Sequence, residues 1–577
     1  MRPYFAKMAD FGKPLRENRI ARSQQSRAKL EAVEAEIAAL RKARENVGIP
    51  AEKINERGAM TVWQRLEYLV DPGTWQPLHS LYNPEENEEG TTNVVDGLGK
   101  IAGRWAVIIG FDNKVLAGAW IPGQPENILR VTNLAKRLNI PLVWLVNCSG
   151  VKLPEQERFY AGRRSSGTPF YRHAELEQAG IPVLAGIYGT NPAGGGYQGI
   201  TPTILIAHKD ANIAVGGAGI VSGMSPRGGF DADGLEQLIA ATRDLKERPP
   251  GRAETHYNET GFFTHLCDEE KGVLDGIKTY MRAIPAYDPM FFRVAEPAEP
   301  VLPGADLYHL LPFNQKETYV VEDILARLVD GSEHMEFRPD YGPEIYAGLV
   351  KIDGLPVGVI ANRQGLLPPG YPEYAKYPGI GGKLYRQGLI KMSEFVTHCG
   401  RDRLPVIWLQ DTSGIDVGDA AEKAELLGLG SSLVYSIQQV DVPMMLVVLR
   451  KGSAAAHYIM GGPTANRHNA FTLGTAATEI YVMHGETAAV ATYARRAIKD
   501  KDSGKPLEPI AQKMNEMAKK YHDTSRPIYC ARHGFVDEVV DLTALRSYLQ
   551  AVAGSVYQNP RSICPRHQML LPRLIKG

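Results

Sequence analysis

Two short segments of small residues are the strongest candidates for chemistry in this sequence. The first spans residues 186–197, reads GIYGTNPAGGGY and follows an apolar run that is typical of a buried strand. We therefore expect a tight turn that leads into a helix. Glycine has no Cβ, so a ligand can approach backbone N–H groups, which have no partners at a helix N-terminus. N–H groups presented in this way can stabilise an oxyanion. The second segment, SAAAHY at 453–458, resembles the first in its small residues.

Another turn precedes each of these segments and also follows a strand-like run. Residues 147–151 read NCSGV and pair with the turn 193–195, whereas residues 411–415 read DTSGI and pair with the turn 454–456. If each turn presents one N–H group, the two groups of a pair can hold one carbonyl oxygen, as in an oxyanion hole. Close packing of a helix on a strand also requires small residues, and would explain a single turn. Two turns in each of two copies favour a ligand site.

These turns belong to a repeat that runs through most of the chain. NIPLVWLVNCSGV at 139–151 returns as RLPVIWLQDTSGI at 403–415, and IPVLAGIYGTNPAGGGY at 181–197 returns as VPMMLVVLRKGSAAAHY at 442–458. Further pairs follow in the same order, which predicts two tandem copies of one domain. Short apolar runs alternate with helical stretches, so each copy is expected to be of the α/β class. Strand candidates in the first copy are residues 105–109, 141–146, 182–187, 204–207 and 213–215.

The copies imply domain borders. We expect an N-terminal arm with an amphipathic helix in residues 1–54, a first domain in 55–290, a proline-rich extended linker in 291–312, and a second domain with a C-terminal tail in 313–577. The helix is predicted within residues 17–47, where apolar residues recur at three- and four-residue steps among many charges.

Composition excludes several classes of protein. The 577 residues include 65 Lys and Arg and 65 Asp and Glu, so the net charge is zero, which argues against a nucleic-acid-binding protein and against a polybasic membrane anchor. The five cysteines are scattered without a CxxC pair and predict neither a disulfide framework nor a zinc site. Cys564 and His567 lack a second pair of metal ligands. No apolar run is long enough to span a bilayer, so we expect a cytoplasmic protein without direct membrane insertion.

A dinucleotide site is the main competing interpretation. Gly194, Gly196 and Gly199 match the G-x-G-x-x-G fingerprint after a strand. The acidic residue expected about 20 residues later is not evident. The second copy also replaces the glycines with SAAA at 453–456, which suits a carbonyl approaching two amides better than a pyrophosphate. An NAD-binding oxidoreductase is therefore a remote alternative.

No nucleophile of the usual hydrolase kind stands out. Ser149 and Ser413 precede glycines but lack the G-x-S-x-G elbow. His173, His208 and His457 have no evident carboxylate partner in the sequence. His457 directly follows the second turn and is either a site residue or a hydrogen-bonded core histidine. The site is expected to act through electrostatics and positioning.

A basic segment lies between the two turns of the first copy. Its cations, within residues 151–175, are Lys152, Arg158, Arg163, Arg164 and Arg172. These side chains are of the types that bind the phosphates of coenzyme A or a substrate carboxylate. The alternative is a solvated loop that binds no ligand. The matching segment of the second copy, residues 416–438, is acidic and helical, so the two copies are expected to hold different ligands.

The order of these features resembles the carboxyltransferase components of biotin-dependent acyl-CoA enzymes. The resemblance runs from Thr61 to about Leu549 and includes the paired turns, the proline-rich linker and GFVDEVVD at 534–541. It implies two tandem crotonase-like domains of the ClpP/crotonase spiral type. It also implies a homodimer or a dimer of dimers, in which the first half of one subunit faces the second half of another. The acyl-CoA thioester would be held mainly by the first half, and biotin on a carrier subunit by the second.

The same resemblance implies roles for individual residues. The amides that would form the two oxyanion holes are those of Val151, Gly194, Gly195, Ile415, Ala455 and Ala456. Among them, Val151 and Gly195 would hold the thioester oxygen. Ile415 and Ala456 would hold the ureido oxygen of biotin, with Gly194 and Ala455 as alternatives one residue away. The residues that would bind coenzyme A or biotin are Lys152, Arg158, Arg163, Arg164, Gly414 and His457. No metal is expected.

Within the family, the chain resembles the sodium-pumping decarboxylases. The motifs that carry this are FDNKVLAGAWIPGQPE at 111–126, RKGSAAAHYIMGGP at 450–463 and the tail YQNPRSICPRHQMLLPR at 557–573. Acetyl- and propionyl-CoA carboxylases typically end the second turn in Gly-Gly-Ala-Tyr, from which AAAH at 454–457 departs. The alternative within the family is the carboxyltransferase subunit of a propionyl-, acetyl- or methylcrotonyl-CoA carboxylase.

The decarboxylase branch implies a substrate and partners. The terminal carboxyl group of glutaconyl-CoA would move to biotin on a carrier subunit and leave crotonyl-CoA. A membrane decarboxylase subunit would couple the complex to a Na⁺ pump. The chain itself would be cytoplasmic, and peripheral at the inner face of the cell membrane through those partner subunits.

Overall fold

The computed structural model describes residues 8–199, 202, 204–217, 221, 231–247, 249–285 and 289–559. It divides into two compact units, one formed by Leu40–Ala286 and the other by Met1–Ala39 together with Tyr287–Gly577. We call them the first and the second half. The border between them lies inside α1 (Glu17–Glu45), the amphipathic helix predicted for the N-terminal arm.

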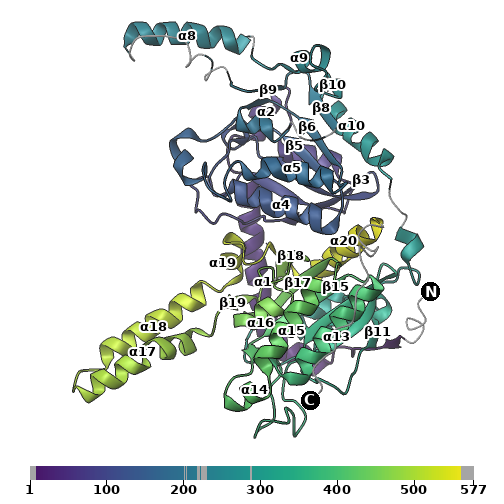
Figure 1. The fold of residues 1–577 in the computed structure, drawn as a ribbon, viewed down its shortest axis with the longest axis vertical. Helices are drawn as coiled ribbons and strands as arrows, with labels where there is room; N and C mark the ends of the chain where they lie inside the picture. The colour runs from purple at the N-terminus through teal and green to yellow at the C-terminus, as the bar shows by residue number, and fades with distance from the viewer. Residues whose placement is uncertain are drawn as a thin grey trace. The chain divides into compact units, whose positions relative to one another are not determined.

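A seven-stranded sheet forms the centre of the first half (Figure 1). Its order is β10-β8-β6-β5-β4-β3-β2. The bounds are β2 (Gln76–Leu78), β3 (Val94–Ile101), β4 (Arg104–Phe111), β5 (Leu142–Val146), β6 (Val183–Ile187), β8 (Ile204–His208) and β10 (His265–Cys267). β2, β3 and β4 pair antiparallel, whereas all pairs from β4 to β10 are parallel. The parallel strands need crossover connections, which the helices supply.

Helices cover this sheet. α3 (Val62–Leu69) and α10 (Glu270–Ala283) share one apolar core with β4, β5, β6 and β8. α4 (Gln124–Leu138) packs against β3 and β4, and α5 (Thr168–Gln178) against β6. The other helices in the described part of this half are α2 (Ala51–Asn55), α6 (Gly194–Tyr197), α8 (Ala232–Glu247) and α9 (Ala253–Asn258).

The start of α3 is fixed by a capping box. The Thr61 hydroxyl accepts a hydrogen bond from the Gln64 N–H at 3.2 Å, and the Gln64 side chain accepts one from the Thr61 N–H at 2.9 Å. These bonds satisfy two N–H groups that the helix leaves without partners.

The second half is built on a nine-stranded sheet. Seven of its strands are β11 (Glu333–Glu336), β12 (Ile345–Ile352), β13 (Leu355–Asn362), β15 (Val406–Thr412), β17 (Met444–Ser453), β18 (Asn469–Gly474) and β20 (Glu538–Val539). β1 (Ala9–Asp10) extends the edge beside β11, and β19 (Glu479–Tyr481) pairs with the end of β17.

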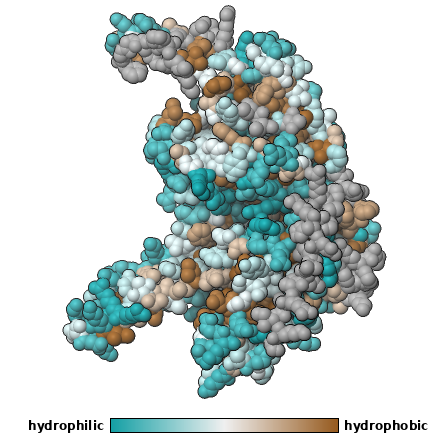
Figure 2. Space-filling view, viewed as in Figure 1, coloured by the Kyte–Doolittle hydropathy of each residue, from teal (hydrophilic) through white to brown (hydrophobic). Residues whose placement is uncertain are grey.

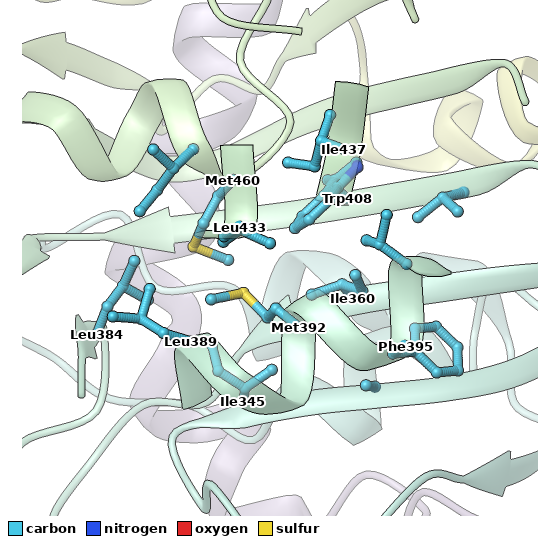
Figure 3. Close-up of a cluster of buried hydrophobic side chains, with 14 of the residues drawn as sticks. Ile345, Ile360, Leu384, Leu389, Met392, Phe395, Trp408, Leu433, Ile437 and Met460 are labelled. Carbon is cyan, nitrogen blue, oxygen red and sulfur yellow. The ribbon is translucent and has the colours of Figure 1, made fainter. Parts of the chain in front are cut away.

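The core of the second half lies between this sheet and two helices, α13 (Arg386–Asp402) and α15 (Leu426–Gln439). Met392, Leu433 and Met460 meet near the centre of this cluster, beside Trp408 of β15 (Figure 3). The other helices are α11 (Leu307–Leu310), α12 (Val321–Leu325), α14 (Asp419–Lys423), α16 (Ala454–Ile459), α17 (Gly485–Asp502), α18 (Glu508–Asp523), α19 (Pro527–Arg532) and α20 (Leu545–Gln558). The surface over the hairpin α17–α18 is mainly hydrophilic in the face that Figure 2 shows.

The two halves repeat one topology. The series β2, β3, β4, β5, β6, β8, β10 and the series β11, β12, β13, β15, β17, β18, β20 have the same order, with two antiparallel pairs followed by four parallel pairs. The short pair β7 (Thr190–Pro192) and β9 (Asn212–Ala214) matches the pairing of the end of β17 with β19. The predicted α/β class and the tandem repeat are therefore confirmed.

The proline-rich linker differs from the expected extended segment. A 3₁₀ turn at Gly304–Asp306 leads into α11, and Leu307, Leu310 and Leu311 are buried. Burying these side chains favours a compact helical turn. The prolines of this segment predicted an extended chain instead. The predicted domain borders themselves stay a prediction.

Candidate active site

The two turns of the first half meet at Gly195. A Cβ atom built on Gly195 would lie 2.4 Å from the carbonyl oxygen of Cys148 and 3.1 Å from its Sγ. A second contact joins Gly150 and Pro192, because a Cβ on Gly150 would lie 3.5 Å from the proline Cγ. The structure thus brings together the turns 147–151 and 193–195, and only glycine fits at the closest point of approach.

Three predicted amides of this half lack a hydrogen-bond partner among the described residues. Trp120 N–H donates to the Gly150 carbonyl at 2.7 Å, and Lys152 N–H donates to the Trp120 carbonyl at 2.9 Å, so the intervening Val151 N–H points away from this bridge. No described residue accepts a hydrogen bond from the N–H of Val151, Gly194 or Gly195. α6 begins at Gly194, so the last two are first-turn amides of a short helix.

Asn191 joins the two turns of the first half, and sequence reasoning missed it. Its side-chain oxygen accepts from the Cys148 N–H at 2.7 Å, and its amide donates to the carbonyls of Tyr188 at 2.9 Å and Asn212 at 3.1 Å. Asn191 is fully buried. An asparagine before proline in GTNPAG reads as an ordinary turn residue, so its long-range contacts left no signal in the sequence.

The second half repeats the arrangement around Ile415. Ser413 N–H donates to the Gly382 carbonyl at 2.8 Å and Asp416 N–H to the Leu384 carbonyl at 3.0 Å, as Ser149 and Lys152 donate in the first half. These bonds belong to the parallel pair β14 (Lys383–Leu384) and β16 (Gly414–Ile415). Ile415 therefore takes the place of Val151. Gly414 has a φ of 123°, which explains the need for glycine there.

Helix α16 brings the second turn to this place. It packs against β16, and a Cβ on Gly430 of α15 would lie 3.7 Å from Ile415 and 3.8 Å from Ile459. Ala456 is fully buried. Among the described residues, none accepts a hydrogen bond from the N–H of Ala455 or Ala456. The second half therefore also brings the turn 454–456 close to β16.

His457 is buried and hydrogen-bonded, which corresponds to the second interpretation of its sequence position. Its Nδ1 lies 2.7 Å from the Gln410 side-chain oxygen, while the Gln410 amide donates to the carbonyls of His457 and Met460, both at 3.2 Å. Gly452 leaves room, since a Cβ there would lie 2.9 Å from Nδ1. Burial lowers the pKa of His457 to about 4. The imidazole is therefore neutral near pH 7, and its Nδ1–H donates to Gln410.

The side chains beside the first turn do not provide a nucleophile. Burial raises the pKa of the Cys148 thiol to about 12. The Ser149 hydroxyl donates to the Leu116 carbonyl at 2.8 Å. A protonated thiol and a hydroxyl that is already engaged are poor nucleophiles. The chemistry available at this point is stabilisation of a developing negative charge by backbone amides.

Most cations of the basic segment are paired with glutamates, some within the segment and some elsewhere in the sequence. Lys152 donates to Glu155 and, at 2.6 Å, to Glu89; these hydrogen bonds, the one to Glu155 first, raise the pKa of Lys152. Arg158 contacts Glu155 at 2.6 Å and Glu85 at 3.4 Å. The local excess of positive charge expected from the sequence is thus reduced by residues 85–89.

Arg163 and Arg164 are both exposed. Arg164 forms a bidentate pair with Glu126 at 2.6 and 2.8 Å, with 71% of its side chain exposed. Arg163 is exposed, and among the described residues none forms an ion pair with it. Both arginines are accessible to an anionic ligand.

Comparison with known proteins gives the family. The model of the carboxyl transferase domain matches residues 53–570. The chain belongs to the carboxyl transferase family.

Relatives of this carboxyltransferase cover most or nearly all of its length. It is 53% identical over 576 residues to the glutaconyl-CoA decarboxylase subunit alpha of Acidaminococcus fermentans. This alignment covers 99% of this chain and 97% of the relative. It is 24% identical over 501 residues to the methylmalonyl-CoA decarboxylase subunit alpha of Propionigenium modestum, covering 85% and 89% of the two chains. The crystal structure of the beta subunit of P. aeruginosa geranyl-CoA carboxylase shares the fold, with a TM-score of 0.77, 22% identity and coverage of 96% and 98%.

These findings confirm the family and the crotonase-like fold expected from the sequence, and they favour carboxyl transfer over a nicotinamide-dependent reaction. Within the described ranges, every helix falls short of the length and apolarity that a membrane span requires. In the same ranges, no group of three or more His, Cys, Asp or Glu is arranged to hold a metal ion. Cys564 and His567 lie outside the described residues.

Proposed function

We propose that this carboxyltransferase moves the terminal carboxyl group of glutaconyl-CoA to biotin on a carrier subunit and leaves crotonyl-CoA. The observation that carries the proposal is the pair of amide-presenting turns in each of two diverged halves. The 53% identity to a glutaconyl-CoA decarboxylase alpha subunit, over nearly the whole chain, supports the choice of substrate.

In this proposal the first half holds the thioester. Breaking the bond between the γ carbon and the carboxylate leaves an electron pair on that carbon, which is conjugated through the double bond to the thioester carbonyl. The amides of Val151 and Gly195 would stabilise the negative charge that reaches the carbonyl oxygen, with Gly194 as the alternative. One proton then returns to the γ carbon. One proton leaves the ureido nitrogen, so the protons balance. Lys152, Arg158, Arg163 and Arg164 would bind the phosphates of coenzyme A.

The second half would hold biotin. Biotin supplies a ureido nitrogen that accepts the carboxyl group. The N–H groups of Ile415 and of Ala456, or Ala455, would bind its ureido oxygen, and Gly414 and His457 would line the site. Such bonds favour negative charge on the oxygen and thereby make the nitrogen more nucleophilic.

The partners follow from the same assignment. A biotin carrier subunit would bring biotin to the second half. A membrane subunit that pumps Na⁺ would then remove the carboxyl group from biotin. A homodimer or a dimer of dimers would join the first half of one subunit to the second half of another. The chain would then lie in the cytoplasm, peripheral at the membrane through those partners.

The test is turnover of CoA esters by the purified full chain. Glutaconyl-CoA with free biotin or biocytin is expected to give crotonyl-CoA, detected by chromatography, while omission of biotin stops the reaction. 2-Iminobiotin, which lacks the ureido oxygen, is the matched control and should not replace biotin. Turnover of methylmalonyl-CoA without turnover of glutaconyl-CoA would overturn the choice of substrate.

A further inference from the structure

Each half contains a fully buried arginine that stacks on a tyrosine ring directly behind the candidate turn. In the first half, the Arg65 guanidinium lies 3.9 Å from the centre of the Tyr188 ring. In the second half, the Arg450 guanidinium lies 4.8 Å from the centre of the Tyr319 ring. A desolvated cation over an aromatic face is attracted by roughly 2 kcal/mol.

In the first half this arginine holds the residue that begins the turn. Arg65 donates to the side-chain oxygen of Asn147 from both terminal nitrogens at 3.3 Å. Its charge is balanced by Glu270, which accepts two further bonds at 2.8 Å. Both ends of the pair are almost completely buried. The planar fork of the guanidinium fixes three groups in one geometry.

The second half uses the equivalent residue, Asp411, as the counter-ion itself. Arg450 donates through Nε to one oxygen of Asp411 at 2.8 Å, and the other oxygen accepts from the Lys451 N–H at 3.2 Å. Its Nη1 donates to the carbonyls of Asn314 at 3.0 Å and Glu317 at 2.8 Å. Neither side chain of the ion pair is exposed.

The arginine–tyrosine pair of one half is not a copy of the pair in the other half, because the arginine and the tyrosine have exchanged places. In the first half the arginine comes from α3 and the tyrosine follows β6, whereas in the second half the arginine lies on β17 and the tyrosine precedes α12. α3 corresponds to α12 and β6 to β17 in the repeat. Since duplication alone preserves position, copying alone does not account for both pairs. This points to a requirement of the turn.

Stability alone does not explain the arrangement. Burying a charge is unfavourable, and an apolar group of similar volume is often equally stable in its place. A bonded guanidinium does, however, fix the direction of a turn better than an apolar side chain. We propose that Arg450 with Asp411 positions the amide of Ile415, and that Arg65 with Asn147 positions the amide of Val151. This rests on the proposed function, in which the second half binds biotin and the first binds the CoA ester.

The test compares Arg450→Lys with its counterpart Arg65→Lys in the full chain. Lysine keeps the charge but loses the fork. Arg450→Lys is expected to raise the KM for biotin about tenfold or more, with the KM for glutaconyl-CoA nearly unchanged, because a small displacement of one amide weakens only its own ligand. Arg65→Lys should do the reverse. A proportional loss for both substrates in both variants would overturn the proposal.

Hydrogen exchange separates this result from a failure of the proposed function. In Arg450→Lys, the bonded amides of Ser413 and Asp416 should exchange faster, while those of Ser149 and Lys152 keep the wild-type rate. In Arg65→Lys the pattern should be reversed. If the wild-type chain did not decarboxylate glutaconyl-CoA, the proposed function would fail, yet this comparison would still decide the positioning role. Unchanged exchange in both turns would refute it.

A milder pair of variants covers the case in which a lysine variant does not fold. Tyr319→Leu and Tyr188→Leu remove the ring beneath each guanidinium and leave the ion pairs intact. The same half-specific change in KM and in exchange is expected, with a smaller amplitude. Equal effects of the two variants on both halves would also contradict the proposal.

Discussion

Ala193 and Ala454 stand at equivalent points of the two halves, and both have a positive backbone φ, of 48° and 50°. Each lies just before the candidate oxyanion amides. Positive φ is unfavourable for a residue with a Cβ atom, so the chain stores backbone strain at the same step of both turns. In both halves this conformation lies where a strand ends and the short helix that carries these N–H groups begins.

Replacing Ala454 by glycine should therefore stabilise the protein. Relief of strain outweighs the greater entropy of glycine in the unfolded chain, so we expect a gain of about 1 kcal/mol. The midpoint of thermal unfolding measures it. Ala511→Gly, in the exposed interior of α18, is the matched control and should lower stability by about 0.5 to 1 kcal/mol. A loss of stability in both variants would show that Ala454 is unstrained.

Gly195 and Gly194 should differ sharply when either is replaced by alanine. The added Cβ meets the Cys148 carbonyl oxygen at 2.4 Å in Gly195→Ala, but its nearest neighbour in Gly194→Ala is Phe170 Cζ at 4.0 Å. Gly195→Ala must push the two turns apart, and a displacement of about 1 Å can lower turnover roughly 100-fold. Gly194→Ala should keep nearly wild-type turnover. Equal rates of crotonyl-CoA formation in the two variants would rule out the contact between the turns as a requirement.

Much of the fold could be predicted because it depends on local patterns. The strand expected at residues 182–187 is β6 (Val183–Ile187), and the helix expected within residues 17–47 is α1. Comparing the copies also identified both pairs of turns, since small residues at strand ends recur in order. The short helix α11 escaped prediction because prolines surround it while its buried leucines give no long period.

The support of the site could not be predicted, because it depends on partners far away in the sequence. Arg65 and Glu270 are separated by 205 positions, and neither lies in a motif. The basic segment was recognised, but Glu85, Glu89 and Glu126, which pair with three of its cations, lie elsewhere in the sequence. Sequence reasoning thus located the backbone groups of the site, whereas the side chains that hold them required the tertiary structure.

Arg164 and Glu126 offer a test of coenzyme A binding. If Arg164 binds a phosphate, Arg164→Ala should raise the KM for the CoA ester severalfold at constant kcat, since the lost contact is the same in the ground state and the transition state. Glu126→Gln removes the carboxylate that competes for this arginine and should lower the KM. Initial rates at low ionic strength measure both effects. An unchanged KM in both variants would make Arg164 a solvated surface residue.

His457 should make stability depend on pH between about 6.5 and 4. Burial lowers the pKa of this histidine from 6.5 to about 4, so in that window the unfolded chain binds a proton that the folded chain excludes. The stabilising contribution is complete above pH 6.5 and is lost as the pH falls toward 4, by about 3 kcal/mol in total for one such group. Urea unfolding of the full chain at pH 7, 6 and 5 measures this loss of stability. His457→Gln cannot titrate and should show a shallower decline, although its stability at pH 7 is lower because the bond to Gln410 is disturbed. A decline as steep as that of the wild type would mean that the imidazole is already accessible to protons in the folded chain.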